Sequence, residues 1–190
     1  MPKIIVDKDF EIEDVLRFAT EKHKGQKRDD GSDYITHPIR VAKIVDDFKA
    51  KNSANRKILI AGALLHDTIE DTYTSYKELS QNFGEVVASL VMELSTAEYA
   101  CHYKGKAQYL AEKMEHMTSY ALTIKLADRL DNISDLKGCT KQKKVKTIND
   151  TIYILDYLEK QRPLTKSQIA LFNAIKEKIE MYKKTITNIK

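Results

Sequence analysis

Four residues in one short segment have side chains suited to metal chemistry: His66, Asp67, Glu70 and Asp71. They follow a run of mostly aliphatic residues, so they stand at one end of a predicted buried helix. On a helix, His66 lies one turn from Glu70, and Asp67 lies one turn from Asp71. Burying an imidazole beside three carboxylates is costly unless the charges are paired or hold a cation. A lone His-Asp pair is more typical of a solvated helix end, but the full cluster favours a divalent first-row metal such as manganese, iron or zinc.

Two further residues are candidate ligands for the same ion. His37 precedes Pro38 at a loop-to-helix junction, where an imidazole can point into a cleft, although a lone histidine there is more often structural. Asp128 follows the apolar segment Ala121–Leu126, so it enters the core side of its helix. It could simply cap the helix or pair with Arg129. Beside the two histidines and Asp67, it is a candidate fourth ligand.

A basic loop offers groups that suit a phosphorylated ligand. The segment Gly25–Gly31 carries Lys27 and Arg28. A guanidinium can stack on a nucleobase and can bind phosphate with two hydrogen bonds. A solvated loop is an equally good interpretation of these residues by themselves. The other basic run, Lys137–Lys146, is more typical of a solvated face than of a nucleic-acid patch, because it lacks interleaved aromatic residues.

The elements that must position these residues are predicted to be helices throughout. Apolar residues recur at helical spacing, and two capping boxes, Ser75 with Glu78 and Thr165 with Gln168, mark helix starts. Lys3–Val6 is the only weak candidate for a strand. The histidines His23, His102 and His116 show no ligand-like partners and are expected to be structural or exposed. The predicted helices comprise Ile12–Ala19, Pro38–Val45, Lys57–Ile69, Ser75–Phe83, Val86–Leu94, Lys106–Met117, Tyr120–Leu136, Lys144–Glu159 and Thr165–Tyr182.

Composition limits the class of protein. The 190 residues are 42% hydrophobic, which argues against a disordered chain, and they suit one domain with a real core. Two cysteines, Cys101 and Cys139, without CxxC spacing make neither a disulfide framework nor a thiolate zinc site. No apolar run is long enough to span a bilayer, and the N-terminus is unlike a signal peptide. We therefore expect a reduced, cytoplasmic protein with no membrane partner. The net charge of +4 fits nucleic acid, a small anion or neither.

Together these residues resemble the metal phosphohydrolases of the HD superfamily, and more narrowly the hydrolase domain of RelA/SpoT homologues, including small stand-alone alarmone hydrolases. Order and spacing agree from Gly25 to about Leu136. The matching pieces are Gly25-Gln26-Lys27-Arg28, Tyr34-Ile35-x-His37-Pro38, Leu64-Leu65-His66-Asp67-x-x-Glu70-Asp71-Thr72, Phe83-Gly84 and Lys125-Leu126-Ala127-Asp128-Arg129-Leu130-x-Asn132.

The resemblance implies an all-α fold: one compact HD-type helical domain over residues 1–190, with a motif core at about 25–136 and a metal site in a central cleft. It implies one Mn²⁺, or another divalent first-row metal, held by His37, His66, Asp67 and Asp128. Too few residues follow the core for a synthetase domain, so a hydrolase-only chain is expected.

The family removes pyrophosphate from the 3′ position of (p)ppGpp, giving GDP or GTP. By that analogy Glu70 and Asp71 orient or deprotonate the attacking water, Arg28 stacks on the guanine base, and Lys27 and Asn132 contact the nucleotide. A polyphosphorylated nucleotide, and no nucleic acid, is then the expected partner.

Two residues depart from the family pattern and bear on the substrate. Asp29 stands where the family often has a basic residue, and Asp131 stands where it often has His or Tyr. Asp29 adds negative charge near the expected nucleotide entrance. Two alternatives therefore stay open. One is the same chemistry on another nucleotide, such as an adenine alarmone or NADPH, and the other is a non-catalytic module that binds an alarmone or a partner protein.

Overall fold

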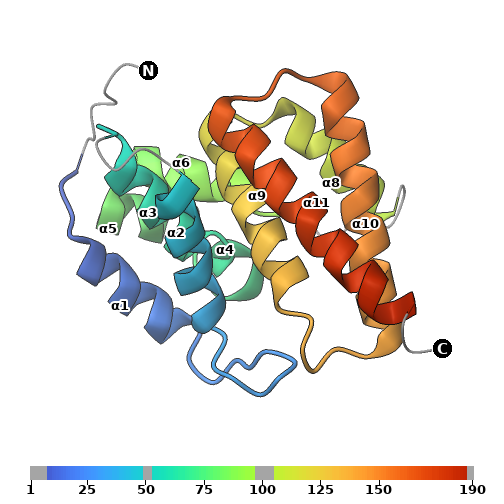
Figure 1. Cartoon of the computed structure of the whole chain (residues 1–190). Coiled ribbons are helices and arrows are strands. Elements are labelled where there is room, and N and C mark those ends of the chain that lie inside the picture. The colour runs from blue at the N-terminus through green and yellow to red at the C-terminus, as the bar shows by residue number, and fades with distance from the viewer. Residues whose placement is uncertain (1–7, 49–52, 97–104, 188–190) are drawn as a thin grey trace. The chain divides into compact units, whose positions relative to one another are not determined.

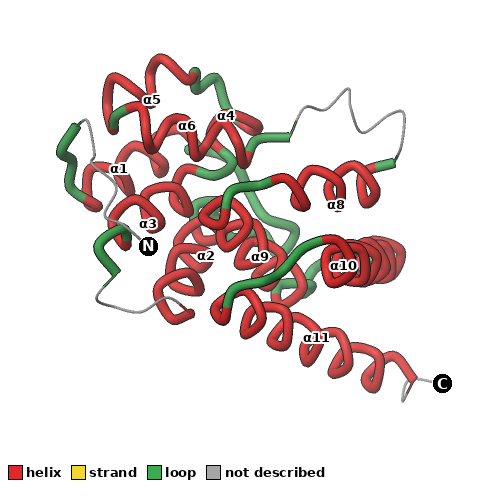
Figure 2. The backbone as a smooth tube through the Cα atoms, turned by 90° about the horizontal axis from the view of Figure 1, so that it is seen from above, coloured by secondary structure: helices red, strands yellow, loops and turns green. Residues whose placement is uncertain are grey.

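The computed structural model describes residues 8–48, 53–96 and 105–187, and within them the chain forms helices joined by loops (Figures 1 and 2). The described residues contain no strand. Extended backbone pairs there in an isolated antiparallel bridge between Lys27 and Asp33. The predicted all-α class is confirmed. The weak strand candidate Lys3–Val6, Cys101 and His102 lie outside the described residues.

The chain divides into two compact units, Met1–Ala97 and Glu98–Lys190. No helix in the described parts of either unit is both long and apolar enough to cross a membrane.

The first unit is built around one helix that is buried on nearly every side. This helix, α3, contacts three others of the unit, namely α1, α2 and α6, and α5 and α6 form a neighbouring pair. Its apolar sequence explains the central position, because a helix without a polar face has no side to present to water. The helices of this unit are α1 (Ile12–Lys22), α2 (Thr36–Phe48), α3 (Arg56–Leu65), α4 (Thr68–Asp71), α5 (Tyr76–Phe83) and α6 (Glu85–Leu94).

The helix predicted over Lys57–Ile69 is interrupted, and this prediction was wrong at its C-terminal end. The chain leaves α3 at His66 and begins the short helix α4 at Thr68. Asp67 between them has φ −102° and ψ −3°, outside ideal helical values, while its carbonyl still accepts a hydrogen bond from the Asp71 N–H at 2.8 Å. The local change in backbone direction changes where the neighbouring side chains of His66 and Asp67 point.

The second unit pairs long helices. Neighbours there are α8 with α10 and α9 with α11, and α9 also contacts α10. Apolar residues of α11, including Leu171, Phe172 and Ile175, are buried. The helices are α8 (Lys106–His116), α9 (Ser119–Ser134), α10 (Lys141–Gln161) and α11 (Lys166–Thr187) (Figure 1).

Both predicted capping boxes mark real helix starts. The Ser75 hydroxyl accepts a hydrogen bond from the Glu78 N–H at 3.1 Å. At the start of α11, the Gln168 side chain accepts from the Thr165 N–H at 2.9 Å, and the Gln168 N–H donates to the Thr165 hydroxyl at 3.4 Å. These contacts satisfy N–H groups that a helix start leaves without an intrahelical partner.

Candidate active site

Three of the predicted ligands meet in the first unit. His37, from the first turn of α2, and His66, from the end of α3, each offer a ring nitrogen, and these two atoms lie within 4.8 Å of each other. Asp67 joins them: its Oδ2 lies 3.0 Å from His66 Nε2 and 3.6 Å from His37 Nε2. All three residues are buried. The structure therefore brings the His37 imidazole to the adjacent pair His66 and Asp67, which stand 29 and 30 positions later in the sequence.

The hydrogen bond on the far side of the His66 ring determines which nitrogen faces the carboxylate. His66 Nδ1 lies 2.8 Å from the Ala63 carbonyl oxygen, which can only accept, so Nδ1 carries the proton. In the neutral ring, Nε2 then presents its lone pair to Asp67 Oδ2. A lone pair and a carboxylate oxygen at 3.0 Å repel each other unless a cation, either a proton or a metal ion, lies between them. A histidine held by a backbone carbonyl through its other nitrogen is also the usual arrangement of a metal ligand.

This donor set fits a divalent metal. Imidazole nitrogen and carboxylate oxygen are ligands for first-row divalent ions, and the buried position limits competition from water. His37, His66 and Asp67 are the residues of the first unit that would hold such an ion. When bound, a metal of this kind polarises a phosphoryl oxygen and lowers the pKa of its water toward about 7.

A tyrosine hydroxyl connects this cluster to a second carboxylate. The Tyr34 hydroxyl lies 2.7 Å from Asp67 Oδ2 and 2.9 Å from Asp71 Oδ2. Burial, with the negative charges of Asp67 and Asp71 beside it, raises the pKa of the Tyr34 phenol above its ordinary value. The phenol therefore stays protonated and acts as a hydrogen-bond donor to these carboxylates.

The loop before α2 is attached to the same place. Gly31 adopts φ +87°, which favours glycine, and closes a tight turn in which the Arg28 N–H donates to the Ser32 carbonyl at 2.9 Å. The Tyr34 N–H in turn donates to the Gln26 carbonyl at 3.0 Å. The Gln26 side chain donates to the Asp71 carbonyl at 2.7 Å, so the loop is tied to the end of α4.

Glu70 points to a different partner from the one its spacing suggests. Its Oε2 accepts a hydrogen bond from the backbone N–H of Thr96 at 2.9 Å. Glu70 and Asp71 are both exposed, in contrast to Asp67. The interrupted helix accounts for this, because α4 is only one turn long and no longer continues the face of α3. An exposed carboxylate held at one oxygen keeps the other oxygen for water.

The basic loop residues have two different environments. Lys27 pairs with Asp33 at 2.6 Å on the surface. The Arg28 guanidinium lies 5.8 Å from the centre of the Tyr34 ring, and Arg28 is half-buried. Asp29 beside it is exposed. Arg28 is thus the basic side chain of this loop that lies against the tyrosine contacting the cluster.

The second unit holds Asp128 in a network of its own on α9. Lys125 Nζ lies 3.5 Å from Asp128 Oδ2, and the Asn132 side-chain amide donates to Asp128 Oδ1. Asp128 and Lys125 are both buried. The sequence left open an ion pair between Asp128 and Arg129. In the structure Asp128 instead pairs with Lys125, one turn earlier on the same helix. Asn132, predicted to contact a nucleotide, orients this carboxylate.

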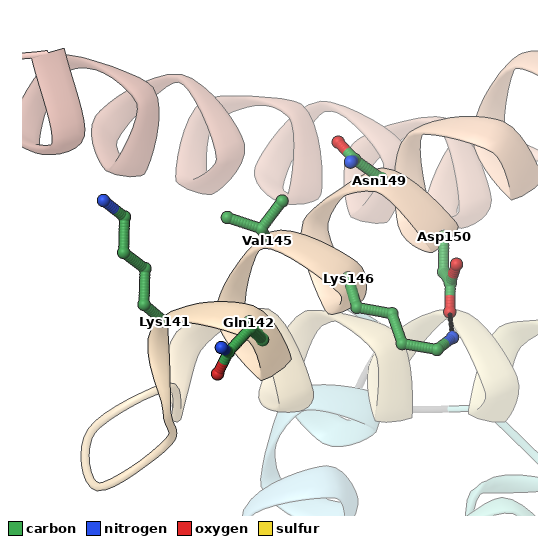
Figure 3. A pocket seen from close by; sticks show the side chains of 6 residues that line it. All are labelled: Lys141, Gln142, Val145, Lys146, Asn149 and Asp150. Carbon is green, nitrogen blue, oxygen red and sulfur yellow. Dashed lines mark hydrogen bonds and ion pairs between the residues drawn. The ribbon is translucent and has the colours of Figure 1, made fainter.

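The basic run at the start of α10 borders a surface hollow in the second unit that includes none of the predicted site residues. Figure 3 shows Lys146 reaching along the helix to Asp150, with which it forms an ion pair. The hollow is lined by one face of a single helix: Lys141, Gln142, Val145, Lys146, Asn149 and Asp150. This is the environment of a solvated helix face, as the sequence predicts.

Sequence reasoning gave no role to three residues that surround the cluster. Tyr34 bridges two carboxylates, and Gln26 links the loop to α4. His23, expected to be structural or exposed, is buried, stacks on the Tyr34 ring at 4.8 Å and approaches Gln26 Oε1 at 2.7 Å. The available signal was that Tyr34 stands three residues before His37, so that a turn into α2 can direct both toward one place.

Comparisons with known proteins show the family of this chain. The family model described as "HD domain" matches residues 15–158. A guanosine-3′,5′-bis(diphosphate) 3′-pyrophosphohydrolase of Aquifex aeolicus is 37% identical over 153 residues, which are 76% of this chain and 20% of that protein. This chain therefore spans about a fifth of the length of that relative. Two relatives carry the same enzyme name with the addition MESH1. The one from Xenopus tropicalis is 36% identical to this chain, and the match covers 72% of that protein. The one from Homo sapiens is 37% identical, and the match covers 69% of that protein.

Solved structures share the fold. A metazoan orthologue of SpoT, described as hydrolysing ppGpp and acting in starvation responses, superposes with a TM-score of 0.74 at 24% identity. The match covers 94% of this chain and 98% of that one. The family model extends over most of the chain and includes all the predicted ligands. The chain belongs to the HD-domain family.

Proposed function

We propose that this protein is a metal-dependent phosphohydrolase that removes the 3′-pyrophosphate of (p)ppGpp. Water adds across the bond between the ribose 3′-oxygen and its phosphorus, releasing pyrophosphate and leaving GDP or GTP with a free 3′-hydroxyl. The observation that carries the proposal is the buried group of His37, His66 and Asp67, whose atoms converge at 3.0–3.6 Å around one carboxylate oxygen. The names of the relatives above supply the substrate.

Mn²⁺ is the proposed ion, with His37, His66 and Asp67 as its ligands from the first unit. Asp128 is proposed as the fourth ligand on the resemblance of its motif alone. The hydrogen bond from Asn132 suits that role, because it fixes the orientation of the Asp128 carboxylate.

Glu70 and Asp71 are proposed to orient the attacking water and to take its proton. A carboxylate in this role typically contributes about 10²–10⁴-fold to the rate. Arg28 is proposed to stack on the base, since a guanidinium offers both a planar face and two donors for phosphate. Lys27 and Asn132 are the further proposed contacts to the nucleotide. Lys27 would exchange its surface ion pair with Asp33 for a phosphate.

The test is a product assay with a panel of nucleotides. The purified protein is incubated with Mn²⁺ and ppGpp, pppGpp, an adenine alarmone or NADPH, and the products are separated by anion-exchange chromatography. We expect GDP and pyrophosphate from ppGpp, which identifies loss of the 3′ rather than the 5′ diphosphate. Turnover of another nucleotide in place of ppGpp would overturn the substrate. Bound Mn²⁺ with no turnover of any nucleotide would instead indicate a non-catalytic module.

A further inference from the structure

The Tyr34 hydroxyl occupies a position between two carboxylates with different proposed tasks. Asp67 Oδ2 lies 2.7 Å from it, and Asp71 Oδ2 lies 2.9 Å from it. Asp67 also contacts both histidines of the cluster, whereas Asp71 lies at the exposed end of α4. One phenol oxygen therefore sets the spacing between the buried ligand group and the exposed carboxylate.

The ring that carries this hydroxyl is held on several sides. His23 stacks on it with centroids 4.8 Å apart, and the His37 ring meets it edge-on at 5.9 Å. The Arg28 guanidinium lies 5.8 Å from its centre. Rotation of the ring would disturb all these contacts, so the hydroxyl has little freedom to leave the two carboxylates.

The two carboxylates, Asp67 and Asp71, require a hydrogen-bond donor at the position of the Tyr34 hydroxyl. Asp67 and Asp71 stand one turn apart, and like charges at that spacing repel each other. A neutral O–H directed between them offsets part of that repulsion, and a hydrogen bond to an ionised carboxylate is stronger than one between neutral groups. A phenylalanine ring could make the same ring contacts but could not supply this donor.

We propose that Tyr34 is a positioning residue that holds Asp67 in the orientation needed to bind the metal and Asp71 in the orientation needed to act on water. This inference rests on the proposed function for the part that concerns Asp71. The part that concerns Asp67 is independent of the substrate, because it is tested by metal binding alone.

The test replaces the hydroxyl and keeps the ring, with Tyr34→Phe. Isothermal titration with Mn²⁺ should show affinity reduced about 10–100-fold, the range for loss of a group that orients a metal ligand. At saturating Mn²⁺, kcat for ppGpp should fall at least about 10-fold while KM changes less than about threefold, because a positioning group for Asp71 acts on the chemical step. Circular dichroism of the metal-free variant should match wild type.

The matched control is Tyr76→Phe. Tyr76 is also in the first unit, and its hydroxyl contacts the Glu85 carboxylate and the Ser89 hydroxyl, outside the ligand group. Its removal should leave Mn²⁺ affinity and kcat unchanged. A role for Tyr34 in ring packing alone predicts that Tyr34→Phe behaves like this control.

Each part of the proposal has its own contrary result. Mn²⁺ affinity of Tyr34→Phe within twofold of wild type would overturn the role toward Asp67. For Asp71, a double-mutant cycle with Asp71→Asn is decisive, because the cost of Tyr34→Phe in kcat should shrink when Asp71 no longer acts. Equal costs in both backgrounds would overturn that role. A wild-type protein that binds Mn²⁺ but hydrolyses nothing would contradict the proposed function and leave the Asp67 test intact.

Discussion

Replacing Asp67 by asparagine separates the charge of the central carboxylate from its shape. An NH₂ group in the place of Asp67 Oδ2 has two hydrogens, which it can donate to His66 Nε2 at 3.0 Å and to the Tyr34 oxygen at 2.7 Å. The Tyr34 O–H then donates to Asp71 Oδ2 at 2.9 Å. We therefore expect the metal-free variant to fold and to be at least as stable as wild type. What it loses is the negative charge that would draw a divalent ion to the two histidines.

The size of the effect follows from binding linkage. Mn²⁺ at 100 times its Kd stabilises the folded wild type by about 2.7 kcal/mol. For a chain of this length each kcal/mol shifts the midpoint of thermal unfolding by about 2–4 °C, so the shift should be about 5–11 °C. Loss of a ligand that lowers affinity about 100-fold leaves about 0.4 kcal/mol at the same concentration, which is a shift of about 1 °C.

The assay measures the midpoint of thermal unfolding with and without Mn²⁺, using circular dichroism as the probe. Asp14→Asn is the matched control, because Asp14 is a half-buried carboxylate on α1, outside the ligand group, and is paired with Arg17 at 2.6 Å. The control should show the full shift. A Mn²⁺-induced shift in Asp67→Asn as large as that of wild type would refute the ligand assignment. A metal-free variant that does not fold would refute the argument that the amide satisfies His66.

Three further predictions concern residues with separate roles. Glu70→Gln keeps an oxygen acceptor for the Thr96 N–H, so Mn²⁺ affinity should stay within about threefold of wild type. Single-turnover hydrolysis should slow by about 10²–10⁴-fold. An unchanged rate would show that Glu70 has no part in the chemistry. Arg28→Ala removes the guanidinium beside the Tyr34 ring. The KM for ppGpp should rise about 10-fold, with Mn²⁺ affinity unchanged. A fall in kcat at constant KM would contradict a role in base binding. Arg162→Met removes a guanidinium that donates to three backbone carbonyls at the end of α8. In urea unfolding the variant should be less stable by about 2–3 kcal/mol, with no change in Mn²⁺ affinity. Unaltered stability would show that water replaces the guanidinium at no cost.

The fold class and the helix starts could be predicted because they depend on neighbouring residues. A helical apolar period and a Ser or Thr three residues before Glu or Gln are local signals, and α5 and α11 begin where these signals stand. The candidate ligands could also be named, since only a few side-chain types bind a divalent ion. Their motif gave the order and spacing that identify the family.

The backbone break at the centre of the motif could not be predicted. No glycine or proline follows Gly62 before the end of α4 at Asp71, so periodicity favours one helix through Ile69. The break places Asp67 Oδ2 against His66 Nε2 and leaves Glu70 to bond with Thr96. His66 keeps helical angles, φ −56° and ψ −29°, and the departure is at Asp67, with φ −102° and ψ −3°. A departure at one residue leaves no signal in the apolar period of the sequence.

The sequence by itself determined that this chain is helical, which residues are candidates for its chemistry, and that an HD-type metal site was to be expected. Only the tertiary structure decided which atoms meet. The Tyr34 hydroxyl reaches a carboxylate 33 positions away, and the Gln26 amide reaches a carbonyl 45 positions away. Contacts at such separations leave no periodic trace in a single sequence, because they depend on the path of the whole loop and on the helices that anchor its ends.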